Sequence, residues 1–250
     1  MESKGRSDQA DVSVAAVHDA AALWRYSPIL RGAVRTLNYL VGHGPIGLTP
    51  GRALQSDFVE WAAEVFDWPG FGLAELYANR TEIHEHDFLP LAVLHDLLLN
   101  LRLARHYKGR LMITRHGRAL AGAPARLWEA LLPELLFRTD HGQYMREPYQ
   151  FSGDWEMILE IMNIQVHRGA SETRICAALL DVPDAAARRD HVVRTIIGMY
   201  VLQPLVWAGL LAEIADGSSI AREPIYVKTP LWDAALVFPG SGYLGPPAVH

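Results

Sequence analysis

The chain has 250 residues, half of them apolar and a fifth charged, and its 23 Lys and Arg against 28 Asp and Glu give a net charge of −5. Such a chain can bury a large core and has the composition of an ordinary folded protein of two or three small modules. The acidic balance excludes a general attraction to nucleic acid, so any such binding has to be local. The only cysteine, Cys176, excludes an internal disulfide framework and suits a reducing cytoplasm.

The N-terminal part of the chain is predicted to be helical. Residues 1–18 are polar and small, which predicts a flexible tail, and they lack the apolar block of a signal peptide. Apolar residues at helical spacing predict a helix from Ala20 to Leu40. Thr49-Pro50 is typical of a helix start, and Trp68-Pro69-Gly70 is expected to end that helix.

The segment from Leu97 to Trp128 concentrates positive charge in this otherwise acidic chain. It follows a helix, Phe88 to about Arg105, that is apolar on nearly all sides and is therefore predicted to be buried. The segment contains no Asp or Glu, which leaves a balance of −12 in the rest of the chain. Its seven basic residues are Arg102, Arg105, Lys108, Arg110, Arg115, Arg118 and Arg126.

The same segment predicts a β-hairpin between two helices. A strand leads to a turn at Lys108-Gly109, a second strand runs from Arg110 to Thr114, and Thr114 is expected to cap a new helix. A helix followed by a two-stranded hairpin is the wing of a winged-helix module. We call this predicted hairpin the basic wing.

The C-terminal part repeats this alternation of helices and short strands. Thr195 to Ala212 is uncharged and about long enough to span a bilayer, but Gln203-Pro204 interrupts it, which favours a buried helix leading into a strand. No membrane association is expected. The predicted elements are a helix from Ala125 to Phe137, helices capped by Asp154, Ser171 and Asp184, strands from Leu210 to Ile214 and Ile225 to Lys228, and a last helix at Thr229-Pro230.

Three segments of the chain are alike, because each goes from a strand through Thr into a predicted helix. They are GLTPGRAL (Gly47 to Leu54), ITRHGRAL (Ile113 to Leu120) and YVKTPLWDAAL (Tyr226 to Leu236). Thr suits both sides of this position, since it is β-branched and its hydroxyl accepts from the free N–H groups of a new helix. The repetition favours winged-helix repeats.

The order of residues from Leu97 to Trp128 resembles a group of uncharacterised bacterial proteins associated with plasmids and mobile elements, which are predicted to hold tandem winged-helix units. The resemblance extends over about residues 35–236 and implies a fold more than an activity. The last unit departs from the Thr-x-x-Gly pattern at Leu231-Trp232-Asp233.

These patterns together predict a mainly α fold with small β-hairpins (α+β), built of tandem winged-helix-like units. The expected division is a flexible tail (1–18), an N-terminal helical or winged-helix-like unit (19–75), a central winged-helix unit with the basic wing (76–138), a C-terminal helical or winged-helix-like unit (139–238) and an irregular tail (239–250).

Catalytic and metal-binding motifs are weak. His84, His86 and Asp87 could together hold a divalent ion, but no further ligands follow at a recognisable spacing, and a polar surface loop is the favoured interpretation. No Gly-rich phosphate loop, nucleophile elbow or zinc-binding cysteine pair occurs in the sequence. We therefore expect neither an enzyme nor a protein with a metal or another cofactor.

The leading functional hypothesis is a cytoplasmic protein that binds DNA without catalysis. A role as a regulator is one form that this function could take. Cations on a projecting hairpin contact phosphates, which gives affinity without sequence choice. The alternative is a protein-interaction scaffold with the same fold, and the sequence leaves the oligomeric state open. The residues expected to contact nucleic acid are Arg105, His106, Lys108, Arg110, Arg115 and Arg118.

Overall fold

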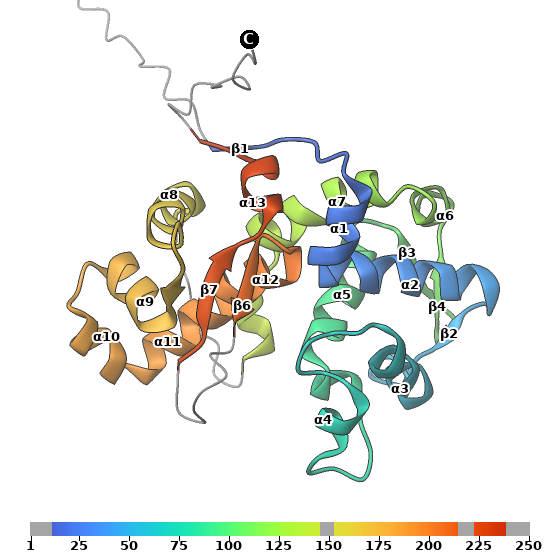
Figure 1. Ribbon diagram of the computed structural model, residues 1–250. Coiled ribbons are helices and arrows are strands. Elements are labelled where there is room, and N and C mark those ends of the chain that lie inside the picture. Colours follow the sequence, from blue (N-terminus) through green and yellow to red (C-terminus); the bar gives the residue numbers. More distant parts are fainter. Residues whose placement is uncertain (1–11, 146–152, 215–222, 239–250) are drawn as a thin grey trace, which may run out of the picture.

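The computed structural model describes residues 12–145, 153–214 and 223–238, and the expected irregular tail at residues 239–250 lies outside them. The described chain is mainly helical with small antiparallel sheets, as predicted (Figure 1). Its N-terminal half contains α1 (Ala20–Tyr26), α2 (Pro28–Gly42), β2 (Ile46–Gly47), α3 (Ser56–Val65), α4 (Leu73–Tyr77), α5 (Leu89–Asn100), β3 (Ala104–Tyr107), β4 (Arg110–Ile113), α6 (Arg115–Ala121) and α7 (Pro124–Pro133).

The C-terminal half follows a π-helical turn at Glu134–Arg138 and a 3₁₀ turn at His141–Tyr144. Two further short strands, β1 (Ser13–Val14) and β8 (Leu236–Val237), pair with each other. The remaining elements are α8 (Trp155–Gln165), β5 (Ala170–Ser171), α9 (Glu172–Leu180), α10 (Asp184–Arg189), α11 (His191–Ile197), a π-helical turn (Gly198–Leu202), α12 (Gln203–Ala208), β6 (Leu211–Ile214), β7 (Ile225–Lys228) and α13 (Pro230–Ala235).

The first sheet has the strand order β2-β4-β3. Lys108 and Gly109 form the predicted turn between β3 and β4, both with positive φ (48° and 71°), as a two-residue hairpin loop of type I′ requires. Strand β2 then adds to the free edge of β4, with Ile46 opposite Leu111. Residues from both sides of the expected boundary at 75/76 therefore belong to one sheet.

The second sheet repeats this order as β5-β7-β6. Ala170 lies opposite Tyr226 at the edge of β7, and Leu211 lies opposite Lys228 in the hairpin. In each half a helix precedes a short edge strand, further helices follow, and the hairpin comes last. The chain therefore uses one topology twice.

The turn before each hairpin also repeats in detail. A left-handed residue follows each helix, Arg102 in the turn after α5 and Gly209 directly after α12 (φ 55° and 86°). The threonine after each hairpin donates its backbone N–H to the residue just before that hairpin. The bonds run from Thr114 N to Leu103 O and from Thr229 N to Leu210 O, both at 3.0 Å. Each threonine hydroxyl also caps the next helix, accepting from Gly117 N at 3.0 Å and from Leu231 N at 3.1 Å. Two of the three similar segments are thus structurally equivalent.

The third similar segment, Gly47 to Leu54, differs from the prediction. No helix begins at Thr49-Pro50; Thr49 N instead donates to Ala53 O at 2.8 Å, and Leu48 bridges to Leu54. Helix α3 begins only at Ser56. A Thr-Pro pair is a local signal for a helix start, and here the burial of Leu54 in the core turns the segment into a closed loop instead.

Two predicted helices are interrupted, and part of the expected tail is ordered. Pro28 has no N–H, so Ser27 ends α1 and caps α2 within the predicted helix from Ala20. Asp190 accepts from Val193 N at 3.0 Å and starts a new helix within the one predicted from Asp184. Within the expected tail of residues 1–18, β1 pairs with β8, Ala15 N donates to Ala235 O and Val17 is buried.

The two halves pack through α12, the helix that precedes the second hairpin, against residues of the N-terminal half. Trp128 of α7 donates its indole N–H to Ala208 O at the end of α12, at 3.0 Å. The ring centroids of Trp68 and Trp207 lie 6.3 Å apart in T-shaped geometry. Among the described helices, none is long and apolar enough to cross a membrane, and the segment around Pro204 is a core helix.

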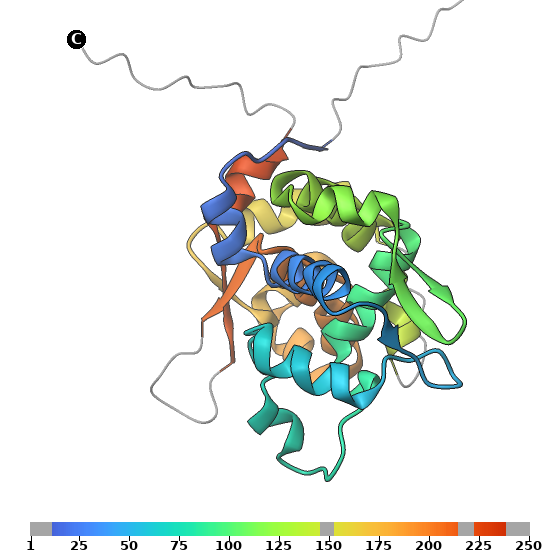
Figure 2. The same cartoon turned by 90° about the vertical axis from the view of Figure 1, so that its right-hand side faces the viewer.

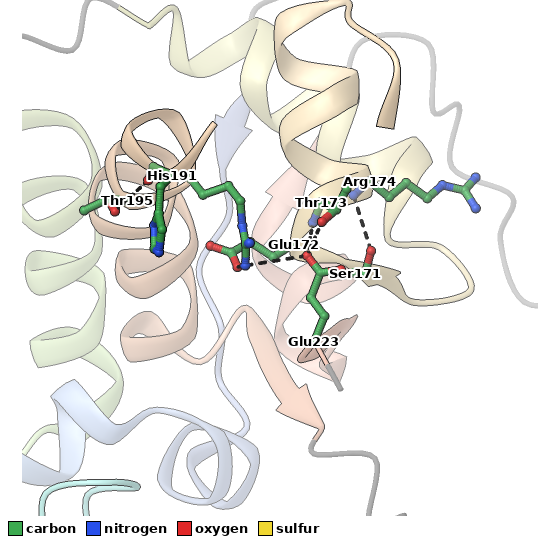
Figure 3. Close-up of polar contacts among 8 residues, drawn as sticks. Ser171, Glu172, Thr173, Arg174, His191, Thr195 and Glu223 are labelled. Atoms are coloured by element: carbon green, nitrogen blue, oxygen red, sulfur yellow. Dashed lines mark hydrogen bonds and ion pairs between the residues drawn. The ribbon is translucent and has the colours of Figure 1, made fainter. Parts of the chain in front are cut away.

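A cluster of charged side chains joins α9, α11 and the segment just before β7 in the C-terminal half (Figure 3). Glu223, just before β7, accepts from the backbone N–H and the hydroxyl of Thr173 at the start of α9. Arg194 of α11 pairs with Glu172 of α9 and lies 3.9 Å from Glu223. These charges compensate one another within the fold, so the cluster is structural.

Cys176 is fully buried in α9. Burial, with a smaller contribution from the charge of Glu172, raises the pKa of this thiol to about 12. The reactive thiolate is therefore scarce at neutral pH. We expect the native protein to resist Ellman's reagent and to react stoichiometrically once unfolded; rapid labelling under native conditions would contradict the placement of Cys176 in the core.

Candidate nucleic-acid interface

The outer face of the basic wing carries cations around an exposed aromatic ring. Side chains alternate along a strand, and Arg105 and Tyr107 of β3 and Arg110 of β4 are exposed, with Tyr107 directly opposite Arg110. Lys108 is exposed at the turn. Figure 2 shows the hairpin (green) at the edge of the molecule, where a long ligand has access to it.

The ring of Tyr107 makes cation–π contacts with two of these cations. The guanidinium carbon of Arg105 and the ammonium nitrogen of Lys108 are each 5.3 Å from its ring centroid. Such cation–π contacts hold the long side chains beside an aromatic face that is itself 47% exposed. A base or sugar can stack on such a ring while the cations meet phosphates.

The cations of the basic segment are free of carboxylates. All seven, from Arg102 to Arg126, are exposed. Elsewhere in the chain Arg80 pairs with Asp87 and Arg194 with Glu172, whereas none of the seven forms an ion pair with a carboxylate of the described residues. Arg115 and Arg118 lie on α6, which begins two residues after β4 ends. Their charge is thus available to an external anion.

His106 lies on the opposite face of β3 from the cations. It is half-buried, and its Nε2 is 2.9 Å from Nε2 of the buried His95 on α5. Burial, and then the charges of His95 and Arg52, lower the pKa of His106 below its usual 6.5. In the free protein at neutral pH, His106 is therefore not one of the wing's cations.

Helix α5 cannot read bases, because its side chains are used inside the fold. Asn100 at its end is the only residue of α5 that is classed as exposed. The hydroxyl of Tyr144 donates a 2.5 Å hydrogen bond to the carboxylate of the partly buried Asp96. Base readout in the major groove requires an exposed polar helix face. The buried residues of α5 are Pro90, Leu91, Val93, Leu94, His95, Leu97 and Leu98.

The hairpin of the second half lacks the basic face of the first. In the described parts of β6 and β7, Glu213 is exposed, and Lys228 donates to Asn163 while lying over the Trp232 ring. The same topology therefore carries a cationic surface in one half and a mixed one in the other. The basic wing is a local specialisation and not a consequence of the fold.

Arg52 belongs with the wing, although the sequence prediction left it out. Its loop reaches the hairpin because Leu48 N donates to Gly109 O at 2.9 Å, beyond the end of β2 (blue loop in Figure 2). Arg52 is exposed and left-handed (φ 66°). No local pattern marks it, since its position depends on β2 pairing with a strand more than fifty residues later.

The histidine and acid cluster is divided by the fold. His84 and His86 are exposed with ring centroids 5.5 Å apart, Asp87 pairs with Arg80 at 2.8 Å, and Glu85 points into the core. Within the described residues, no group of three or more His, Cys, Asp or Glu side chains is arranged to hold a metal ion.

Comparison with known proteins gives two family matches in succession. The Y4jL N-terminal domain matches residues 25–126, and the y4jL C-terminal domain matches residues 145–230. The chain is also 36% identical over 154 residues, or 61% of its length and 69% of the relative's, to "Uncharacterized protein y4jL" of Sinorhizobium fredii (strain NBRC 101917 / NGR234). No solved structure matches the chain.

Proposed function

We propose that this chain, which belongs to the Y4jL family and is matched in turn by the N- and C-terminal domains of that family, is a non-catalytic nucleic-acid-binding protein made of two winged-helix-like units. The repeated strand order supports this fold, as do the equivalent threonine caps at Thr114 and Thr229. The expected 19–75 and 76–138 segments then form one unit, because β2 and the hairpin share a sheet. The second unit corresponds to 139–238.

The observation that carries the function is the set of exposed, unpaired cations around Tyr107. Arg105, Lys108 and Arg110 on the wing, with Arg115 and Arg118 on α6, act as phosphate contacts. Electrostatic contacts of this kind hold a protein on a duplex without fixing a sequence. Since α5 is buried, we propose backbone binding with little sequence preference, and a regulatory role only together with another specificity determinant.

Titration of the intact protein with a generic short duplex DNA, followed by fluorescence anisotropy over a salt series, tests this function. If all five cations contact phosphates, the logarithm of the association constant should fall against the logarithm of salt concentration with a slope of about −4.5. Absence of binding at low salt, or binding that is insensitive to salt, would remove nucleic acid as the ligand.

A protein-interaction scaffold is the second candidate. It is favoured by the use of α5 and α12 for internal packing and by the net charge of −5, which opposes general nucleic-acid binding. In that case the basic wing meets an acidic face of a protein partner. A protein that shows no duplex binding, yet forms a salt-sensitive complex lost in wing variants, would support this alternative.

The setting of the protein is part of the proposal. From the resemblance of residues 97–128 we propose a cytoplasmic bacterial protein associated with plasmids or other mobile elements. A nucleic-acid-binding wing is useful only in a compartment that contains nucleic acid.

A further inference from the structure

A pocket of about 600 Å³ lies between the loop after β2 and the tip of the basic wing. Two of its lining residues, Arg52 and Lys108, are exposed cations, and His106 contributes an imidazole. Of its lining side chains, none is acidic.

A buried chain of hydrogen bonds connects this pocket to the core. His106 Nε2 lies 2.9 Å from His95 Nε2, and His95 Nδ1 lies 2.6 Å from Glu85 Oε1. The other carboxylate oxygen of Glu85 accepts from Leu54 N at 2.6 Å. His95 and Glu85 are only 5% and 6% exposed, so water does not compete for these bonds. The chain ends on the same loop that supplies Arg52.

These hydrogen bonds assign a tautomer to the imidazoles of His95 and His106. Glu85 accepts from Leu54 N with one oxygen, and with its other oxygen also accepting, His95 donates from Nδ1 and its Nε2 is an acceptor. His106 must then donate from Nε2. Its other ring nitrogen, Nδ1, takes no part in this series of hydrogen bonds. While His106 is neutral, that Nδ1 carries a lone pair and repels an anion. A proton added there makes His106 a cation whose charge is balanced through His95 by Glu85.

We propose that this pocket binds a phosphate group, with Arg52 and Lys108 as charge contacts and a protonated His106 as hydrogen-bond donor, oriented by His95 and Glu85 as positioning residues. Where the phosphate group is part of bound nucleic acid, the inference rests on the proposed function. A free phosphate ion would make the same contacts with the pocket. Binding at this pocket takes up one proton, which the outer face of the wing does not.

The direction of the pH dependence follows from the groups that face His106. Burial and the charge of Arg52 on the loop disfavour its cationic form, and a charged His95 on α5 would do so too, whereas Glu85 before α5 and Asp96 on α5 favour it. With His95 neutral and accepting at Nε2, the charge of His95 does not oppose the proton on His106. Lys108 shares the pocket and also opposes the cation. A phosphate offsets Arg52 and Lys108, so the pKa of His106 is higher in the complex than in the free protein. Affinity is therefore greatest below the free pKa and falls as pH rises through the bound one.

The decisive experiment compares wild type and His106→Gln in duplex-DNA titrations from about pH 5.5 to pH 7.5, the range in which histidines titrate. Gln can still donate to His95 but does not titrate. We expect wild-type affinity to rise by up to about tenfold per pH unit as the pH falls, relative to the variant. Arg52→Gln should weaken binding at every pH. An identical pH profile for wild type and His106→Gln overturns the proposal.

Glu85→Gln tests the positioning role. Without the buried carboxylate the His106 cation loses its counter-charge, so the midpoint of the pH profile should move to lower pH while the affinity in acid is retained. A merely structural Glu85 would weaken binding uniformly or unfold the protein, which thermal unfolding of the same sample detects. A uniform loss with an unchanged midpoint would remove Glu85 and His95 from the proposal.

Nitrogen NMR of His106 separates this inference from the proposed function. Inorganic phosphate and duplex DNA are added in separate titrations. A shift of the His106 ring nitrogens with both supports both proposals, and a shift with phosphate alone, without duplex binding, keeps the pocket and removes the nucleic-acid function. Duplex binding with no shift from either ligand overturns the pocket and leaves the outer wing as the site.

Discussion

Gly209→Ala is expected to lower the free energy of unfolding by about 3–5 kcal/mol, the range of severe backbone and packing substitutions. Gly209 ends α12 with a φ of +86°. An added Cβ would lie 2.4 Å from Tyr26 O and 2.8 Å from Ser27 Cα, and backbone cannot move aside as a flexible side chain can. The loss should appear in urea unfolding as a lower midpoint, because α12 and the α1–α2 connection would be forced apart.

Gly44→Ala is the matched control for this variant. Gly44 has a φ of +92°, close to that of Gly209, but nothing lies within 4 Å of its Cβ position. Its substitution should cost only the conformational penalty of a left-handed alanine, about 1–2 kcal/mol. If the two variants lost the same stability, the close approach of the two halves at Gly209 would be contradicted.

The equivalent position in the first half explains why glycine occurs only once in this role. Arg102, in the turn after α5, adopts the same left-handed conformation, but it is exposed. The strain of a side chain there is tolerated, whereas at Gly209 the other half of the molecule occupies the space. The repeat is therefore conserved in backbone geometry and differs in sequence where the halves meet.

The elements that could be predicted are those with local signals. The turn at Lys108-Gly109, the cap at Thr114 and the burial of α5 each follow from a few adjacent residues or from one helical period. Thr49-Pro50 gave a wrong prediction because the same local signal is overridden by the bridge from Leu48 to Leu54. The joining of β2 to β4 has no local signal, so the sequence places residues 19–75 and 76–138 in separate units where the structure has one sheet.

The candidate site divides in the same way. Alternation along β3 places Arg105 and Tyr107 on one face and His106 on the other, so the inward direction of His106 was within reach of the sequence. Its partner His95 was not, because the contact depends on how α5 crosses the hairpin. Arg52 arrives at the wing only through the tertiary pairing of β2.

Neutralising the outer face of the wing is the second prediction with a large effect. The triple variant Arg105→Gln, Lys108→Asn, Arg110→Gln should bind duplex DNA about 100-fold more weakly at moderate salt, since three phosphate contacts of about 1 kcal/mol each are removed. Asn is chosen at position 108 because it tolerates the positive φ of 48° found there. The salt slope should become shallower by about 2.7, or 0.9 for each lost contact.

A second triple variant, Arg168→Gln, Arg174→Gln and Arg189→Gln, removes the same net charge from exposed positions of the C-terminal half. It should retain nearly wild-type affinity and salt slope, because an exposed charge beyond a Debye length of about 10 Å is largely screened. Equal losses in both variants would mean that binding follows overall charge and that the wing has no special role. A loss confined to the wing variant would show that the wing is a local contact surface on an acidic molecule. Both variants remove three positive charges, so only direct contact with phosphates distinguishes the two sets of cations.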